Sequence, residues 1–415
     1  MKKQLKKILQ KDKILNLVYR VLTILFKFLL SIIIVKKLSV YDLGVFGIFQ
    51  TTVMLMIYVL GFDFYTYNTR ELLKKNRRDL SFYIGNQILF HSAVYLIVLP
   101  CSLFLFFYDV ISTEYLLYFY LILVAEHISQ EIYRILIVLK KSVTASLTLF
   151  LRAGLWILAL YAVWTFNLSS QTIRDIFIIW AIGGTISIIV GVFQIPVQFK
   201  FRVDLSWIRR GIRVAAPFLV ATLFYKVIEF SGRYFLDFYS TKEEVGIFTF
   251  FSGISNAMFV LVQSTVIIVM SPYLIESVSE GLKAFQKVYK DYQKQVLYTT
   301  GAGTILASIC IHPLLYYLDN DLLNHNVAIF YLLLMAVMLF CFSYIPHYGL
   351  YSYHKDKSLL WSSIIGALSI IVANFMFVPE FGVLGAAVAQ VLGMLVLLVS
   401  KLYFFNRLKH ANQKI

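Results

Sequence analysis

ILNLVYRVLTILFKFLLSIIIV, residues 14–35, is an apolar stretch long enough to cross a bilayer as one α-helix. It nevertheless carries five polar side chains, Asn16, Arg20, Thr23, Lys27 and Ser31. These follow one another at steps of four, three, four and four residues, so all five lie on the same side of an α-helix. A membrane helix of this kind must turn its polar side toward protein or water, which makes these residues candidates for a functional site.

The two cations of this stretch lie at different depths. Arg20 is about 9 Å from the start of the apolar run at 1.5 Å per residue, so its side chain can also reach the cytoplasmic headgroups. Lys27 is roughly 20 Å from that start, which is too deep for the same explanation. Lys27 therefore indicates a cavity or a partner inside the membrane more strongly than Arg20 does.

The composition of the whole chain is that of a polytopic membrane protein. Of its 415 residues, 60% are hydrophobic and only 14% are charged, whereas about a quarter of the residues in soluble domains are charged. The net charge of +16 comes from short basic clusters between apolar runs and not from a nucleic-acid-binding module, so no nucleic acid partner is expected. The three cysteines lie far apart inside apolar runs, which excludes a disulfide framework and a CxxC metal site.

Apolar runs of about 20 residues recur along the chain and predict twelve transmembrane spans. All should be α-helices, because a backbone exposed to lipid must satisfy its own hydrogen bonds. The expected fold class is therefore an all-α integral membrane protein. The predicted spans are 14–35, 43–62, 82–107, 115–138, 143–166, 172–195, 211–236, 245–270, 293–317, 327–350, 358–378 and 382–406.

The connections between these spans alternate in charge. Those assigned to the cytoplasm carry 27 basic residues and those on the other side carry four, so the positive-inside rule places both termini in the cytoplasm. The long inner segments 63–81 and 271–294 mix basic and apolar residues, and each is expected to lie as an amphipathic helix on the inner leaflet. The outer loops, of about ten residues or fewer, are too short for an extracellular catalytic domain.

The turn after the first span recurs half a chain later. A shift of 202 residues lays SVYDLGVF, residues 39–46, on TKEEVGIF, residues 241–248, and Gly44 recurs as Gly246. The shift corresponds to six spans, an even number, so the two halves insert with the same orientation and should be related by an axis along the membrane normal. The sequence predicts two pseudo-symmetric six-helix bundles around a central cavity, with the domains 1–200 and 201–415.

The polar stripe of the first span returns in the seventh. Thr222, Lys226, Glu229 and Arg233 follow at steps of four, three and four, and subtracting 202 gives positions 20, 24, 27 and 31. Both stripes are expected to face the cavity between the halves. Alternatively, Lys226, Glu229 and Arg233 neutralise one another as a structural ion-pair network.

Further charged residues fall inside the predicted spans. Arg152 lies about 15 Å beyond the nearest inner lysines, where it either adds to a positive cavity or pairs with Glu126. Glu131 and Arg134 are close to a cytoplasmic end, and a local salt bridge is expected there.

Two segments resemble a known family. The turn at 39–44 resembles the loop and glycine that open the second helix in the multidrug/oligosaccharidyl-lipid/polysaccharide exporter superfamily. NFMFVPEFGVLGAA, residues 374–387, resembles the tight last hairpin of its polysaccharide branch, where one helix ends at Pro379 and a Gly-x-x-Gly-Ala-Ala motif opens the next. With twelve spans in two similar halves, the resemblance covers essentially the whole chain.

The resemblance implies a flippase of the bacterial inner membrane, similar to those that move polyprenyl-diphosphate-linked O-antigen or capsule repeat units by alternating access. Such a cargo calls for cations inside the membrane, because its diphosphate is costly to desolvate. The expected contacts for the diphosphate or for anionic sugars are Arg20, Lys27, Arg152, Lys226 and Arg233. The expected sites for a coupling H⁺ or Na⁺ are Glu229 and Glu126, and no other cofactor is expected.

The partners implied by the resemblance are undecaprenyl-diphosphate-linked oligosaccharide, the lipid bilayer, a polysaccharide polymerase and a chain-length regulator. No metal site and no catalytic residue is predicted. A lone histidine inside a span, such as His127 or His347, is expected to be a hydrogen-bonded packing residue.

Three other functions are to be distinguished from this one. A multidrug exporter of the same superfamily should hold organic cations with mostly acidic residues, whereas cations predominate in the two stripes. A flippase of lipid-linked peptidoglycan precursors usually has fourteen spans, for which this chain has no room. A membrane glycosyl polymerase or ligase needs a large outer loop with catalytic residues, and none of the predicted loops is large enough.

Overall fold

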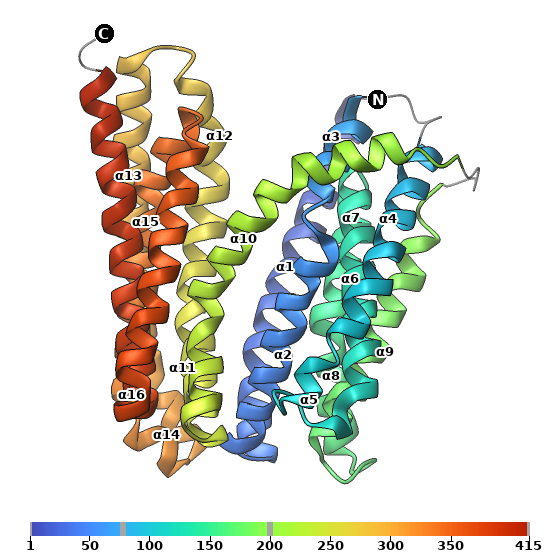
Figure 1. The fold of residues 1–415 in the computed structure, drawn as a ribbon, viewed down its shortest axis with the longest axis vertical. Helices are drawn as coiled ribbons and strands as arrows, with labels where there is room; N and C mark the ends of the chain where they lie inside the picture. Colours follow the sequence, from blue (N-terminus) through green and yellow to red (C-terminus); the bar gives the residue numbers. More distant parts are fainter. Residues whose placement is uncertain (1, 75–79, 197–201, 413–415) are drawn as a thin grey trace. The chain divides into compact units, whose positions relative to one another are not determined.

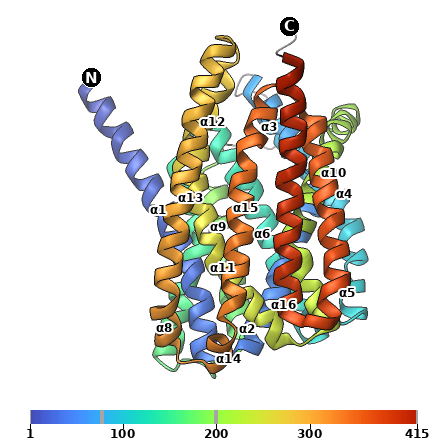
Figure 2. The ribbon, with the colours of Figure 1, turned by 90° about the vertical axis from the view of Figure 1, so that its left-hand side faces the viewer.

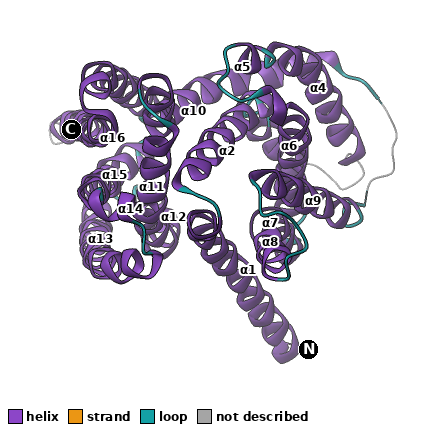
Figure 3. Cartoon of the chain, turned by 90° about the horizontal axis from the view of Figure 1, so that it is seen from below, coloured by secondary structure: helices purple, strands orange, loops and turns teal. Residues whose placement is uncertain are grey.

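The computed structural model describes residues 2–74, 80–196 and 202–412, and within these ranges the chain forms helices joined by loops, without a strand (Figure 3). Ten of the described helices are long and apolar enough to cross a membrane. α6 (Leu116–Val138) adds an eleventh of sufficient length, and α16 (Asp356–Asn412) is two helices that meet at a kink at Gly382. The prediction of an all-α membrane protein is confirmed. The described helices are consistent with the predicted twelve membrane crossings.

The described residues pack into two compact units. Unit 1 comprises residues 2–38 and 48–223 of the described ranges, and unit 2 comprises the short segment 39–47 and residues 224–412. The predicted domains 1–200 and 201–415 stay a prediction. The observed units divide instead inside α10 (Leu205–Tyr239), a continuous helix that belongs to unit 1 up to Leu223 and to unit 2 beyond it.

Unit 1 is built from apolar helices whose buried faces are rich in aromatic rings. Phe49 stacks on Phe177 with 4.0 Å between ring centroids, and Trp156 stacks on Trp180 at 5.8 Å. Besides the first part of α10, the unit contains α1 (Lys2–Lys37), α2 (Val40–Gly61) from Ile48 onward, α3 (Tyr65–Lys74), α4 (Leu80–Cys101), α5 (Phe104–Phe107), η2 (Thr113–Tyr115), α6, α7 (Ser142–Phe150), η3 (Leu151–Leu155), α8 (Trp156–Thr165) and α9 (Ile173–Val192).

Unit 2 is a bundle in which α13, α15 and α16 run side by side (Figure 2). Its core includes Ile228, Phe340, Ile370 and Leu397, which come from α10, α15 and both parts of α16. Besides the second part of α10 and the start of α2, the unit contains α11 (Lys242–Val262), η4 (Gln263–Ile267), α12 (Ile268–Ser277), α13 (Leu282–Leu318), α14 (Asp321–His325), α15 (Val327–Ser352) and α16 (Figure 1).

The repeated turns lie against each other in unit 2. A Cβ atom on Gly44 would overlap the carbonyl oxygen of Lys242, and a Cβ atom on Gly246 would overlap the carbonyl oxygen of Val40. The two contacts are reciprocal under the shift of 202 residues, as in a self-complementary two-fold contact. The recurrence of glycine in both turns therefore has a packing cause, namely close approach of the two backbones.

Gly44→Ala is expected to lower the unfolding free energy by about 1–3 kcal/mol, since a side chain here must displace a backbone carbonyl. The measurement is a thermal or denaturant unfolding curve of the purified protein. Gly301→Ala is the matched control, because a Cβ atom on this α13 glycine meets nothing within 4 Å and alanine favours a helix. Equal effects of the two substitutions would contradict this account of the turn.

The last hairpin is also held by the repeated turn. Gly382 has φ +51°, and the Oε2 atom of Glu244 accepts a hydrogen bond of 2.8 Å from the backbone N–H of Val383. A Cβ atom on Gly385 would overlap the carbonyl oxygen of Phe377. The glycines of the predicted hairpin thus allow a left-handed turn and a close return of the chain, as their small size suggests.

The two long inner segments differ from each other. The first contains the predicted separate helix, α3, whereas the second does not. The prediction of an amphipathic helix over 271–294 is wrong, because α12 continues to Ser277 and α13 runs unbroken over 37 residues, or about 55 Å. Some of the inner basic residues of the topology prediction lie outside the described residues, namely Lys75, Arg77, Arg78, Lys200 and Lys414.

Candidate functional site

The polar stripe of α1 faces α6 and α7 within unit 1. Asn16 donates a hydrogen bond of 2.9 Å from Nδ2 to the Oγ atom of Ser142, so this part of the stripe meets protein. Thr23 is buried, with its hydroxyl bonded to a backbone carbonyl of its own helix. The guanidinium of Arg20 is exposed, and its Nη2 atom lies 3.5 Å from the hydroxyl of Tyr133.

Deeper along α1, Lys27 belongs to a cluster of charged side chains. Arg152 places Nη1 at 3.2 Å from Oε2 of Glu126 and at 3.1 Å from the backbone oxygen of the same residue. Trp180 donates a hydrogen bond of 2.7 Å from Nε1 to Oε1 of Glu126. Lys27 is exposed and makes no ion pair at 4 Å or less within the described ranges, but it lies near enough to Arg152 and Glu126 to feel their charges. The cluster has two cations and one carboxylate, so one positive charge is in excess.

Arg152 lies in an irregular part of its span. Residues Leu151–Leu155 form the π-helical segment η3 between α7 and α8. A π-bulge inserts an extra residue into a helix and is found frequently at functional sites. The alternative in which Arg152 pairs with Glu126 is the arrangement that the structure contains. The charge of Arg152 is therefore paired with Glu126, whereas Lys27 has no close carboxylate within the described ranges.

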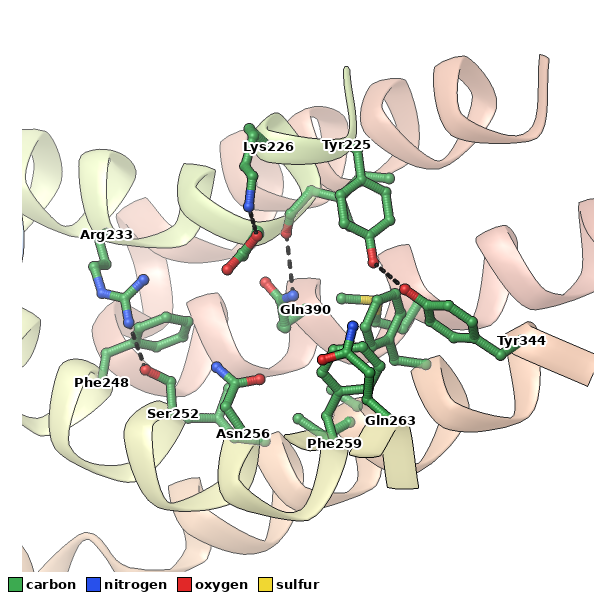
Figure 4. A pocket seen from close by; sticks show the side chains of 17 residues that line it. Tyr225, Lys226, Arg233, Phe248, Ser252, Asn256, Phe259, Gln263, Tyr344 and Gln390 are labelled. Atoms are coloured by element: carbon green, nitrogen blue, oxygen red, sulfur yellow. Dashed lines mark hydrogen bonds and ion pairs between the residues drawn. The ribbon is translucent and has the colours of Figure 1, made fainter. Parts of the chain in front are cut away.

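The polar stripe of α10 is divided between the units. Thr222 donates a hydrogen bond of 2.7 Å to Oδ2 of Asp63 in unit 1. Lys226, Glu229 and Arg233 belong to unit 2, where all three line a cavity of about 250 Å³ (Figure 4). Of the three predicted site residues of this helix, none is turned away from the cavity.

Lys226 and Glu229 form an ion pair of 2.6 Å between Nζ and Oε2, with the side chains 14% and 40% exposed. Arg233 does not join this pair within 4 Å in the described part of the chain. It donates instead from Nη2 to Ser252 Oγ at 2.7 Å and from Nε to Thr249 Oγ1 at 3.2 Å. The predicted self-neutralising network is thus only half present, and Arg233 leaves one positive charge in excess.

Several residues that line this cavity cannot be found by searching the sequence for charged residues inside apolar spans. They are uncharged and come from three helices and η4, namely Asn256, Gln263, Tyr344 and Gln390. A periodic signal for two of them exists in the sequence, because Ser252, Asn256 and Gln263 recur at multiples of about 3.6 residues in an otherwise apolar span. Gln263 opens η4, the π-helical segment of unit 2.

A second buried polar network lies in unit 1 and is separate from the Lys27 cluster. Glu131 pairs with Arg134, as predicted, and its Oε2 atom also accepts a hydrogen bond of 2.6 Å from Gln87 Nε2. Gln87 in turn accepts from Asn68. The guanidinium of Arg134 lies 3.6 Å from the ring centroid of Tyr65. Every member of this network interacts with another member through an ion pair, a hydrogen bond or a cation–π contact, so we interpret its role as structural.

The histidines inside the spans are packing residues. His127 is buried, with Nδ1 at 2.6 Å from the hydroxyl of Tyr95, which confirms the prediction for this residue. His347 packs between tyrosine rings, and its Nδ1 atom has no hydrogen-bond partner among the described residues. Within the described ranges, no group of three or more His, Cys, Asp or Glu side chains could hold a metal ion.

Solved structures similar to this chain are transporters. An inward-facing multidrug resistance MATE family transporter of the MOP superfamily matches with a TM-score of 0.79 at 14% identity, over 96% of this chain and 99% of that one. The lipid II flippase MurJ in an inward closed conformation matches with a TM-score of 0.74 at 14% identity, over 94% and 87% of the two chains. At these identities the matches establish a shared fold.

The sequence comparisons are more specific about the family. No curated protein sequence matches the chain. The family model described as "polysaccharide biosynthesis protein" matches residues 9–278, which is more than half of the chain and includes the α1 stripe, the Arg152–Glu126 pair and the three charged residues of the α10 cavity. The chain therefore belongs to the polysaccharide biosynthesis protein family, with the membrane fold shared by MOP superfamily transporters.

Proposed function

We propose that the protein is a flippase that moves polyprenyl-diphosphate-linked oligosaccharide repeat units from the inner to the outer leaflet of the bacterial inner membrane. The observation that carries this proposal is an excess of one positive charge in an intramembrane polar cluster of each unit. In unit 1 Lys27 and Arg152 face Glu126 alone, and in unit 2 Lys226 and Arg233 face Glu229 alone. Anionic cargo would compensate both clusters.

The roles of the individual residues follow from their partners. Lys27 and Arg233 lack a close carboxylate in the described part of the chain and are the main contacts for diphosphate or acidic sugar. Arg152 and Lys226 contribute while held by their carboxylates, and exposed Arg20 acts at the entrance. We propose ion coupling, for which H⁺ or Na⁺ fits Glu229 better than Glu126, since Glu126 is held by both Arg152 and Trp180 whereas Glu229 is 40% exposed.

A multidrug exporter is the second candidate, because the MATE structure matches with the higher TM-score. Such a protein would have to hold organic cations beside two clusters that already carry excess positive charge. The like-charge repulsion makes this function less favourable than transport of an anion. The match to the polysaccharide family model also supports the flippase.

The experiment that tests the proposal is deletion of the gene in its bacterium, followed by extraction of lipid-linked intermediates. The expected result is accumulation of undecaprenyl-diphosphate oligosaccharide on the inner leaflet, where a reagent that cannot cross the membrane fails to reach it from outside. Expression of the intact gene should restore accessibility. Unchanged intermediates together with increased sensitivity to organic cations would instead support the multidrug exporter.

A further inference from the structure

The cavity of unit 2 has the size of a subsite for one ring. It is lined by α10, α11, η4, α15 and α16, and its volume is about 250 Å³. This is below the roughly 300–1,000 Å³ of pockets that take drug-sized ligands. A whole repeat unit with its diphosphate does not fit, whereas a single sugar ring does.

One end of the cavity is cationic. Figure 4 shows Arg233, Phe248 and Ser252 together on one side of the cavity, with Asn256 next to Ser252. Two of the five N–H groups of Arg233 are used by Thr249 and Ser252, and within the described ranges the other three have no hydrogen-bond acceptor. Since Glu229 neutralises Lys226, this end offers one uncompensated charge with donors in a planar fork.

The middle of the cavity is lined by amide groups. Gln390 is only 8% exposed, and its Nε2 atom donates a hydrogen bond of 3.1 Å to the backbone oxygen of Ile228. Its Oε1 atom is buried and has no partner in the described part of the chain. Asn256 and Gln263 also line the cavity and make no hydrogen bond to any described residue. A buried acceptor without a partner is unfavourable, so a ligand that donates to it would gain affinity.

The other end of the cavity is aromatic. The hydroxyls of Tyr225 and Tyr344 are 3.3 Å apart, and the rings of Phe259 and Phe340 lie 4.7 Å apart between centroids. Such faces pack well against the C–H groups of a pyranose, while amides bind its hydroxyl groups. The three parts of the wall together match a ring that carries one negative charge.

We infer that this cavity is a binding subsite for one acidic sugar ring, of the uronic acid type, with its carboxylate at Arg233 and its hydroxyls at Asn256, Gln263 and Gln390. The inference deepens the proposed function and rests on it for the place of the sugar in the cargo. A diphosphate is the less suitable occupant, because it carries more than one negative charge and this wall has only one in excess.

The test is calorimetric titration of the full-length protein in lipid nanodiscs with methyl glucuronide, methyl glucoside and inorganic pyrophosphate. The expected result is that the glucuronide binds at least tenfold more tightly than the glucoside, and that pyrophosphate binds more weakly than the glucuronide. Arg233→Gln should remove the preference for the acid. Asn256→Leu and Gln263→Leu should weaken both sugars, and Ser264→Ala, an exposed neighbour outside the cavity, should change neither.

Three outcomes overturn the subsite. One is equal binding of the two sugars to the wild type. Another is absence of sugar binding to protein whose thermal unfolding curve shows that it is correctly folded. The third is pyrophosphate binding more tightly than the glucuronide and depending on Arg233. Flipping of lipid-linked oligosaccharide is measured separately on the same preparations. Intact flipping without sugar binding overturns the subsite alone, whereas acid-selective binding without flipping supports the subsite and overturns the proposed function alone.

Discussion

Lys27→Ala is expected to reduce export of the lipid-linked cargo by roughly 10- to 100-fold, the equivalent of one lost hydrogen bond to a charged group. Arg233→Ala should have an effect of the same size. The fold should survive the change at Lys27, because Glu126 keeps Arg152 and Trp180 as partners. The measurement is complementation of the gene deletion, with protein levels in the membrane determined in parallel.

The matched controls remove the same charges from the same helices. Lys37→Ala acts at the exposed end of α1, and Arg213→Ala acts at an exposed position of α10 outside the cavity, so neither should change export. Lys27→Arg should restore most of the activity, since it keeps the charge. Normal export by both Lys27→Ala and Arg233→Ala would show that the charged stripes do not bind cargo.

Glu131→Leu is expected to destabilise unit 1 by about 3–5 kcal/mol, the cost of leaving the partner of a buried ion pair uncompensated. Glu131 is only 7% exposed, and its removal leaves both Arg134 and the amide of Gln87 without an acceptor. The measurement is an unfolding curve of the purified protein in detergent. Since Glu131 belongs to the structural network, protein level should fall together with export.

Two further variants test whether the uncompensated charge of Arg134 causes the loss of stability in Glu131→Leu. The double variant Glu131→Leu with Arg134→Met should recover much of the stability, because an apolar pair of similar volume can replace a buried ion pair. Glu114→Gln is the surface control, since its ion pair of 2.6 Å with Arg174 is exposed and should matter little. A double variant as unstable as Glu131→Leu alone would show that the uncompensated charge of Arg134 is not the cause.

Much of the fold was predictable because lipid imposes simple rules on a chain. Apolar runs of the right length must be helices, and the charge of their connections indicates their direction. The prediction of a separate second inner helix was wrong for a reason that cannot be read from composition. Residues 282–294 continue α13 because their buried aromatic residues, Phe285, Tyr289 and Tyr292, pack against other helices of unit 2.

The candidate site was predictable only in its charged part. A lysine or arginine in an apolar run is conspicuous, and the steps between Lys226, Glu229 and Arg233 place them on one face. The amide groups at Asn256 and Gln263 give only a weaker periodic signal, and Gln390 gives none, because single uncharged polar residues are common in membrane helices. Lys401 was missed although it is buried, 3% exposed, with Ser343 Oγ at 3.3 Å, because it lies close to the predicted inner end of its span.

The sequence by itself determined that this chain is an all-helical membrane protein with a repeated turn and cations at bilayer depth. These properties depend on residue type and spacing along one helix, which a sequence displays directly. Tertiary structure alone decided which charges on different helices come together. Arg152 of η3 meets Glu126 of α6, whereas Arg233 of α10 donates to the hydroxyl groups of Thr249 and Ser252 on α11. The physical reason is that ion pairing requires distances of a few ångströms, and packing between helices sets those distances.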